Sequence, residues 1–209
     1  MGIENYLLFL CAGIVLCVTP GPDMIYLLGR TLAQGKQAGV AAVVGINLGG
    51  YFHLLAAVIG ISALIAASAT AFTVLKWCGA LYLVYLGVQA LRSGGVVPTL
   101  NKTDSANVTY RTILWQGFVS DVLNPKVVVF FVSLLPQFIV PDAGNPTIQL
   151  LVLGVSLNII ALIINLLLVL FAESVIERLG ARKTLASVLN KLLGGIFIGL
   201  GIRLAALQR

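Results

Sequence analysis

The sequence predicts an all-α integral membrane protein with six transmembrane helices, arranged as two inverted repeats of three helices in which the first helix of each repeat is broken. Three observations predict this fold: a very apolar composition, six apolar segments of spanning length, and two proline-containing interruptions at matching places. Of the 209 residues, 59% are hydrophobic and only 10% are charged, whereas a soluble domain carries roughly 25% charged residues. A chain of this composition cannot cover a water-facing surface.

The apolar segments are long and unbroken, which favours helices. Only helices and closed β-barrels satisfy their backbone groups in lipid, and barrel strands alternate in polarity. About 20 residues cross the hydrocarbon core as a helix. The last predicted span is the weakest, because Lys191 and Arg203 lie within it, although both can extend toward the interfaces. The six predicted spans are residues 6–29, 39–67, 72–91, 112–140, 147–172 and 188–207.

The positive charges predict the orientation. Nine Lys and Arg residues fall in loops on one side of the predicted membrane and three on the other. The positive-inside rule makes the first side cytoplasmic and places both termini outside the cytoplasm. Because the net charge of +6 is explained by these short loops, we expect no nucleic-acid partner.

The chain shows weak internal similarity that divides it in two. The stretch "GIVLCVTPGPDM" from Gly13 parallels "GFVSDVLNPKVV" from Gly117, and "KWCGALY" from Lys76 parallels "KLLGGIF" from Lys191. The second and fifth spans also each contain a lone asparagine near the middle. We therefore expect one transmembrane domain over 1–209. Its parts are repeat one at 1–95, a cytoplasmic loop at 96–110 and repeat two at 111–209.

An odd number of spans in each half forces the second half to be inverted relative to the first. Inverted repeats with interrupted helices are typical of secondary transporters, whose binding site lies where the interruptions meet. The alternative is chance similarity between hydrophobic helices. The repeat therefore predicts a transporter with a site at the two breaks.

Both breaks resemble helix starts inside the membrane. Proline is favoured at the first helical position after a side-chain cap, and both Thr19-Pro20 and Asn124-Pro125 fit this pattern. A new helix N-terminus presents unpaired N–H groups and favours a carboxylate. The alternative is a simple proline kink that serves packing.

The glycine of the first break predicts a close approach of a ligand. Pro20 and Pro22 remove two N–H donors, so that Gly21 and Asp23 remain as backbone donors there. Gly21 also lets a ligand come near the main chain. The stretch "GINLGG" from Gly45 would likewise allow a helix backbone or a ligand to come near.

Three charged residues lie at the breaks: Asp23, Asp121 and Lys126. A charge in hydrocarbon costs at least ~2.5–3.5 kcal/mol, and such residues usually mark transport pathways. The alternative is a structural ion pair of Lys126 with one aspartate. Two acids against one base leave one negative charge, which a substrate ammonium or a proton would neutralise. We expect one aspartate to alternate between these two partners.

The remaining polar residues of the spans have two readings each. His53 either relays protons, a role in which histidine side chains often serve, or packs as a hydrogen-bonded residue. Asn47 and Asn158 bind the substrate or the broken backbone, or they link helices. No cofactor, metal site or catalytic group is predicted. The candidate substrate-binding residues are Thr19, Pro20, Gly21, Pro22, Asp23, Asn47, Asp121, Asn124, Pro125 and Lys126, and the candidates for proton coupling are Asp23, Asp121 and His53.

Two other functions have the same architecture. A transmembrane thiol–disulfide electron carrier needs a reactive cysteine in each repeat. Cys17 lies beside the first break, but its counterpart is Asp121 and the second half contains no cysteine. A metal-cation exporter needs a cluster of soft ligands, whereas the chain has one His and scattered acids. An enzyme is not predicted, because no nucleophile–base pair or metal-ligand spacing is present.

Three stretches, "TPGPDM", "KWCGALYLVYLGVQALRS" and "GFVSDVLNPKVVVFF", resemble the lysine-exporter (LysE/RhtB) family of bacterial amino-acid efflux proteins. The T-P-G-P-D form is similar to the homoserine/threonine branch. The resemblance implies export of an amino acid across the bacterial inner membrane, energised by the proton gradient and carried out by a homodimer. It also points to residues 20–23 and to Asp121, Asn124, Pro125 and Lys126.

Overall fold

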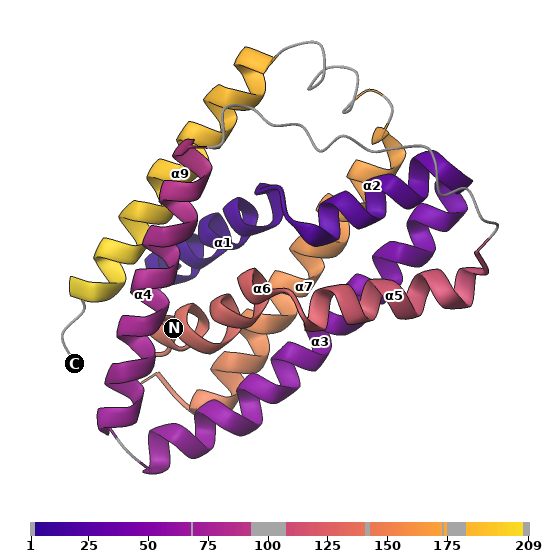
Figure 1. Ribbon diagram of the computed structural model, residues 1–209. Coiled ribbons are helices and arrows are strands. Elements are labelled where there is room, and N and C mark those ends of the chain that lie inside the picture. Colours follow the sequence, from indigo (N-terminus) through magenta and orange to yellow (C-terminus); the bar gives the residue numbers. More distant parts are fainter. Residues whose placement is uncertain are drawn as a thin grey trace.

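The computed structural model describes residues 3–67, 69–92, 108–140, 143–172, 174 and 183–206. Within these ranges the chain is helical and contains no strand (Figure 1), so that the predicted all-α class is confirmed there. The predicted cytoplasmic loop at 96–110 lies almost entirely outside the described residues. The helices are α1 (Ile3–Val18), α2 (Pro22–Gln34), α3 (Lys36–Ala67), α4 (Ala69–Arg92), α5 (Tyr110–Val122), α6 (Pro125–Val129), α7 (Pro146–Leu170) and α9 (Lys183–Ala206), and α6 continues through a π-helical turn (Phe130–Leu134) and a 3₁₀ turn (Leu135–Phe138).

Up to four membrane spans are supported by length and composition within the described residues. The α3 segment Lys36–Gly60 and the whole of α7 are each long and apolar enough to cross a membrane. The pair α1/α2, bent by 52°, and the pair α5/α6 with its following turns, bent by 49°, each qualify as one broken span. Helices α4 and α9, which occupy the third and sixth predicted spans, are not among the spans found within the described residues. The protein is thus a helical membrane protein, and the six-span inverted repeat remains a prediction.

Helix α3 is central to the arrangement. It packs against α5 and α7, while α4 pairs with α9 at one side of the molecule (Figure 1). Helix α1 contacts α7, and α2 contacts both α3 and α5. A two-fold relation between the halves would exchange the α3–α5 pairing with the α1–α7 pairing, and both pairings are present.

Two hydrophobic clusters lie on either side of the breaks. In the first, Phe9 of α1 packs against Phe130 and Phe138, with ring centroids 6.1 and 5.2 Å apart. The second is centred on Leu27 of α2 and Ile113 of α5, which are fully buried. Because α1, α3 and α7 carry apolar residues all round, packing rather than amphipathic patterning decides which of their faces is buried.

Helices α3 and α5 touch through their backbones. A Cβ added at Gly45 would meet the main-chain carbonyl of Leu114, and one added at Gly117 would lie 2.8 Å from the carbonyl oxygen of Ala42. The prediction that the "GINLGG" stretch lets a helix backbone come near is confirmed at Gly45. Small residues let helix backbones approach closely in membranes, where there is little hydrophobic force between helices.

We expect Gly45→Ala to destabilise the protein by about 1–3 kcal/mol, since its methyl group must push α5 away. The measurement is the unfolding transition of the purified protein in detergent. Gly60→Ala on the same helix is the matched control, because a Cβ there has no heavy atom within 4 Å. Equal stability of the two variants would contradict the close α3–α5 contact.

Candidate functional site

The first break joins α1 to α2. Gly21, in an extended conformation, precedes α2, and Pro22 occupies the first helical turn. The predicted cap by Thr19 is wrong: its hydroxyl donates to the Val15 carbonyl oxygen at 2.6 Å, and no side chain caps α2. A threonine hydroxyl bonds readily to the carbonyl four residues earlier. Thr19 therefore belongs to the end of α1, and Pro20 and Gly21 form the link.

The second break has the predicted form. Helix α5 ends at Val122, and the Asn124 side-chain oxygen accepts a hydrogen bond from the backbone N–H of Lys126 at 3.1 Å. Pro125 follows Asn124 as the first residue of α6. The prediction that Asn124-Pro125 is a capped helix start is thus confirmed.

The two breaks contact one another through side chains that each provides. The Lys126 ammonium donates to the main-chain oxygens of Leu16 and Thr19, both at 3.0 Å. In return, the Asp23 carboxylate accepts hydrogen bonds from the Ser120 hydroxyl at 2.8 Å and from the Asn124 side-chain amide. The polar groups of each interruption are thus satisfied largely by the other.

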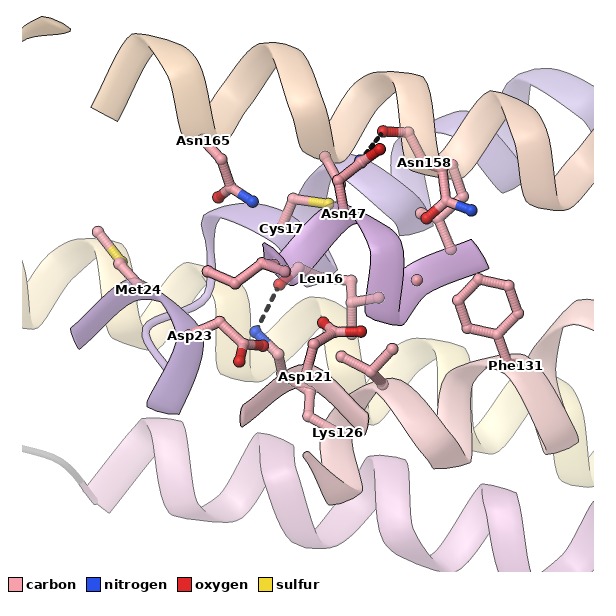
Figure 2. A pocket seen from close by; sticks show the side chains of 15 residues that line it. Leu16, Cys17, Asp23, Met24, Asn47, Asp121, Lys126, Phe131, Asn158 and Asn165 are labelled. Carbon is pink, nitrogen blue, oxygen red and sulfur yellow. Dashed lines mark hydrogen bonds between the residues drawn. The ribbon is translucent and has the colours of Figure 1, made fainter. Parts of the chain in front are cut away.

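A direct ion pair of Lys126 is not present. Neither Asp23 nor Asp121 places an oxygen within 4.0 Å of the Lys126 nitrogen, whose hydrogen-bond partners are carbonyl oxygens. The predicted alternative of a structural Lys–Asp pair is therefore wrong. Lys126 and both aspartates nevertheless gather around the same point (Figure 2), where the ammonium offsets part of their charge through space.

Asp121 is the least satisfied of the three charged residues. It is 4% exposed, and its Oδ2 has no hydrogen-bond partner. His53 of α3 approaches it, with Nε2 3.0 Å from the Asp121 main-chain oxygen and 3.9 Å from Oδ2. The imidazole also stacks on Phe131. The structure therefore places the predicted relay candidate directly beside Asp121.

The two span-centre asparagines link α3 to α7. The Asn47 amide donates to the main-chain oxygen of Asn158 at 2.9 Å, which is the interhelical role considered above. The Asn158 side-chain nitrogen is buried and has no partner, while its oxygen lies against Gly50. A buried donor without a partner calls for an explanation, such as a ligand or a water molecule.

A cavity of about 60 Å³ lies where the breaks meet (Figure 2). Of the predicted site residues, Asp23, Asn47, Asp121 and Lys126 line the cavity. His53 lies outside the lining, next to Asp121. The predicted residues that shape the breaks without lining the cavity are Thr19, Pro20, Gly21, Pro22, Asn124 and Pro125.

Most residues of the cavity wall are not among the predicted site residues. Asn165 lines it from α7, and its position seven residues after Asn158 places both on one helix face. That spacing was a usable signal. The apolar lining had none, because aliphatic residues are present on every face of these helices. The other lining residues outside the predicted site are Leu16, Cys17, Met24, Ile46, Gly50, Val127, Phe131, Leu157, Asn158 and Ala161.

The lining is chemically mixed. An unpartnered carboxylate oxygen and an unpartnered amide nitrogen, both buried, lie within a largely apolar wall. Within the described ranges, no group of three or more His, Cys, Asp or Glu side chains is placed to hold a metal ion. The cavity is suited to a small molecule that carries both a hydrogen-bond donor and an acceptor.

Comparison with known proteins identifies the family. The model of the LysE type translocators matches residues 14–208. The chain belongs to this family. It is therefore a translocator and not an enzyme, and the resemblance to the lysine exporters noted in the sequence is confirmed.

Relatives of this translocator cover nearly its whole length. A leucine efflux protein of Salmonella typhimurium is 30% identical over 207 residues, with 99% of this chain and 97% of the relative covered. A leucine efflux protein of Klebsiella pneumoniae is equally similar. An uncharacterized membrane protein of Vibrio cholerae is 34% identical over 205 residues, with 98% of each chain covered. No solved structure matches the chain significantly.

We expect Lys126→Met to lower the stability of this translocator strongly. The substitution leaves two buried carbonyl oxygens without a donor, at roughly 1.5–3 kcal/mol for each charge-assisted hydrogen bond lost. The measurement is chemical unfolding in detergent. Lys36→Met is the matched control, because Lys36 is exposed at the start of α3. An unfolding midpoint unchanged in Lys126→Met would contradict the assigned contacts.

Proposed function

We propose that this translocator exports a neutral, zwitterionic amino acid from the bacterial cytoplasm across the inner membrane, in exchange for protons. One observation carries the proposal: of the residues that line the cavity between the broken helices, Asp121 has a buried acceptor, Oδ2, and Asn158 a buried donor, Nδ2, without a hydrogen-bond partner. Both are buried, where an unpaired polar group is costly. An amino acid supplies an ammonium for the first group and a carboxylate for the second.

Lys126 adds to the carboxylate side of this arrangement. An ammonium group has three N–H donors, and two of them bind the Leu16 and Thr19 carbonyls. The third is free to bind a substrate carboxylate together with the Asn158 amide. The cavity thus offers an acceptor for the ammonium and donors for the carboxylate of a zwitterion, whose binding adds no net charge.

The substrate side chain is proposed to be uncharged. Asp23 is already occupied by Ser120 and Asn124, so a second ammonium, as in lysine, would have no free carboxylate. The aliphatic and aromatic part of the wall favours an apolar side chain such as that of leucine. The names of the efflux relatives support this choice. Homoserine and threonine, suggested by the T-P-G-P-D form, are the second candidates.

Asp121 is proposed to couple export to protons. With substrate bound, its charge is compensated by the ammonium; after release, a proton must take that place, because a lone buried carboxylate is unstable. Substrate and proton then compete for one oxygen, which produces antiport. His53, whose Nε2 lies 3.9 Å from Asp121 Oδ2, is the proposed route of the proton. The repeat boundaries at 1–95, 96–110 and 111–209 and the homodimer belong to the same proposal.

The substrate proposal is tested in proteoliposomes loaded with labelled leucine, threonine, homoserine, lysine or glutamate under an imposed pH gradient. We expect leucine to move fastest, the two hydroxylated amino acids more slowly, and lysine and glutamate at the rate of empty liposomes. Movement of lysine alone would contradict the assigned charge pattern. A response to divalent metal ions without any amino-acid flux would favour the cation exporter instead.

For coupling, we expect Asp121→Asn to lose proton-driven flux by about tenfold or more while retaining the unfolding midpoint of the wild-type protein. Stability is retained because Oδ2 makes no hydrogen bond that the amide would lose, whereas the loss of a charged partner to the ammonium costs roughly 1.5–3 kcal/mol. Flux is measured with and without the pH gradient. Full gradient-dependent flux in both Asp121→Asn and Asp23→Asn would exclude a coupling role for either residue.

A further inference from the structure

The end of α1 presents carbonyl oxygens that its own helix cannot satisfy. The Leu16 carbonyl would normally accept from the N–H four residues later, but that residue is Pro20, which has no N–H. The helix stops at Val18, so the Thr19 carbonyl has no helical partner either. Proline and the break together thus create two free acceptors at one point inside the membrane.

This point has the properties of a monovalent-cation site. The carbonyls lie at the C-terminal end of a half-helix, which carries partial negative charge, and the Asp23 and Asp121 carboxylates lie on its other side (Figure 2). In transporters with broken helices, such carbonyls and half-helix ends coordinate coupling cations. The partner in this protein is the Lys126 ammonium, at 3.0 Å from each carbonyl oxygen.

Gly21 keeps this site open. A Cβ built at Gly21 would lie 3.2 Å from the Lys126 nitrogen and 3.5 Å from the preceding carbon. A side chain there would press the ammonium away from the carbonyls. Because residue 21 has no side chain, the Lys126 ammonium, which comes from the opposite half of the chain, can reach the carbonyls at the end of α1.

We propose that the Lys126 ammonium is a tethered cation that permanently fills a monovalent-cation site formed by the Leu16 and Thr19 carbonyls. Two consequences follow. The intact protein needs no free Na⁺ or K⁺ for stability or for transport. When the tether is removed, the site accepts a free alkylammonium ion. The transport consequence rests on the proposed amino-acid export, whereas the binding consequence does not.

Lys126→Ala removes a propyl chain and its ammonium, so n-propylammonium is the matched ligand and n-propanol is its uncharged control. We expect n-propylammonium chloride to raise the unfolding midpoint of Lys126→Ala in detergent with a saturable dependence, and propanol or NaCl at equal concentration to raise it much less. We expect no response from Lys126→Met, whose side chain fills the space of the lysine side chain. We also expect none from Lys36→Ala, which is altered at an exposed site. An equal response to propanol, or a response of Lys126→Met, would overturn the proposal.

Transport provides a second test. We expect Lys126→Ala to lose flux by about tenfold or more, as expected from the loss of charge-assisted hydrogen bonds, and to regain at least part of it with n-propylammonium. The wild-type flux should be equal in NaCl, KCl and choline chloride. A wild-type requirement for Na⁺ or K⁺ overturns the proposal even where Lys126→Ala cannot be purified. Failure of all amino-acid flux, with the stability rescue intact, would reject the export function alone.

Discussion

The whole arrangement depends on the reciprocal contact of the two helix breaks. A helix that ends within hydrocarbon leaves backbone groups that lipid cannot satisfy. Here Lys126 from the second break binds the free carbonyls of the first, and Asp23 from the first break binds Asn124 and Ser120 at the second. Neither interruption would be stable alone, so their proximity is a requirement of the fold as well as a feature of the site.

The chemistry of the cavity depends on the polar groups that the contact between the two breaks leaves without a partner. Asp23 uses both of its carboxylate oxygens within the protein. Asp121, on the last turn of α5, keeps one oxygen without a partner, and Asn158 keeps its amide nitrogen. Because Asp121 lies on α5 and Asn158 on α7, a ligand that bridges them would join these two helices of the second half of the chain.

The sequence predicts the breaks, the Asn124 cap and the charged residues, because proline and a charge within an apolar span have few structural explanations. It does not predict which way a hydroxyl turns, and Thr19 binds Val15 of its own helix instead of capping the next one. The apolar cavity wall could not be predicted either, since a residue such as Leu157 differs in no way from its lipid-facing neighbours along α7. The sixth predicted span has the weakest pattern for a similar reason, because Lys191 and Arg203 interrupt its apolar run.

The backbone contact of α3 with α5 has a mechanical consequence. At Gly45 and Gly117 the main chains of α3 and α5 touch with no side chain of these two residues between them, so we expect the two helices to move together. Asp121 of α5 and His53 of α3 both lie on this helix pair, so their spacing should stay constant if the two helices move together. A change between inward-facing and outward-facing conformations would then bend the chain mainly at the two breaks, residues 19–21 and 123–124.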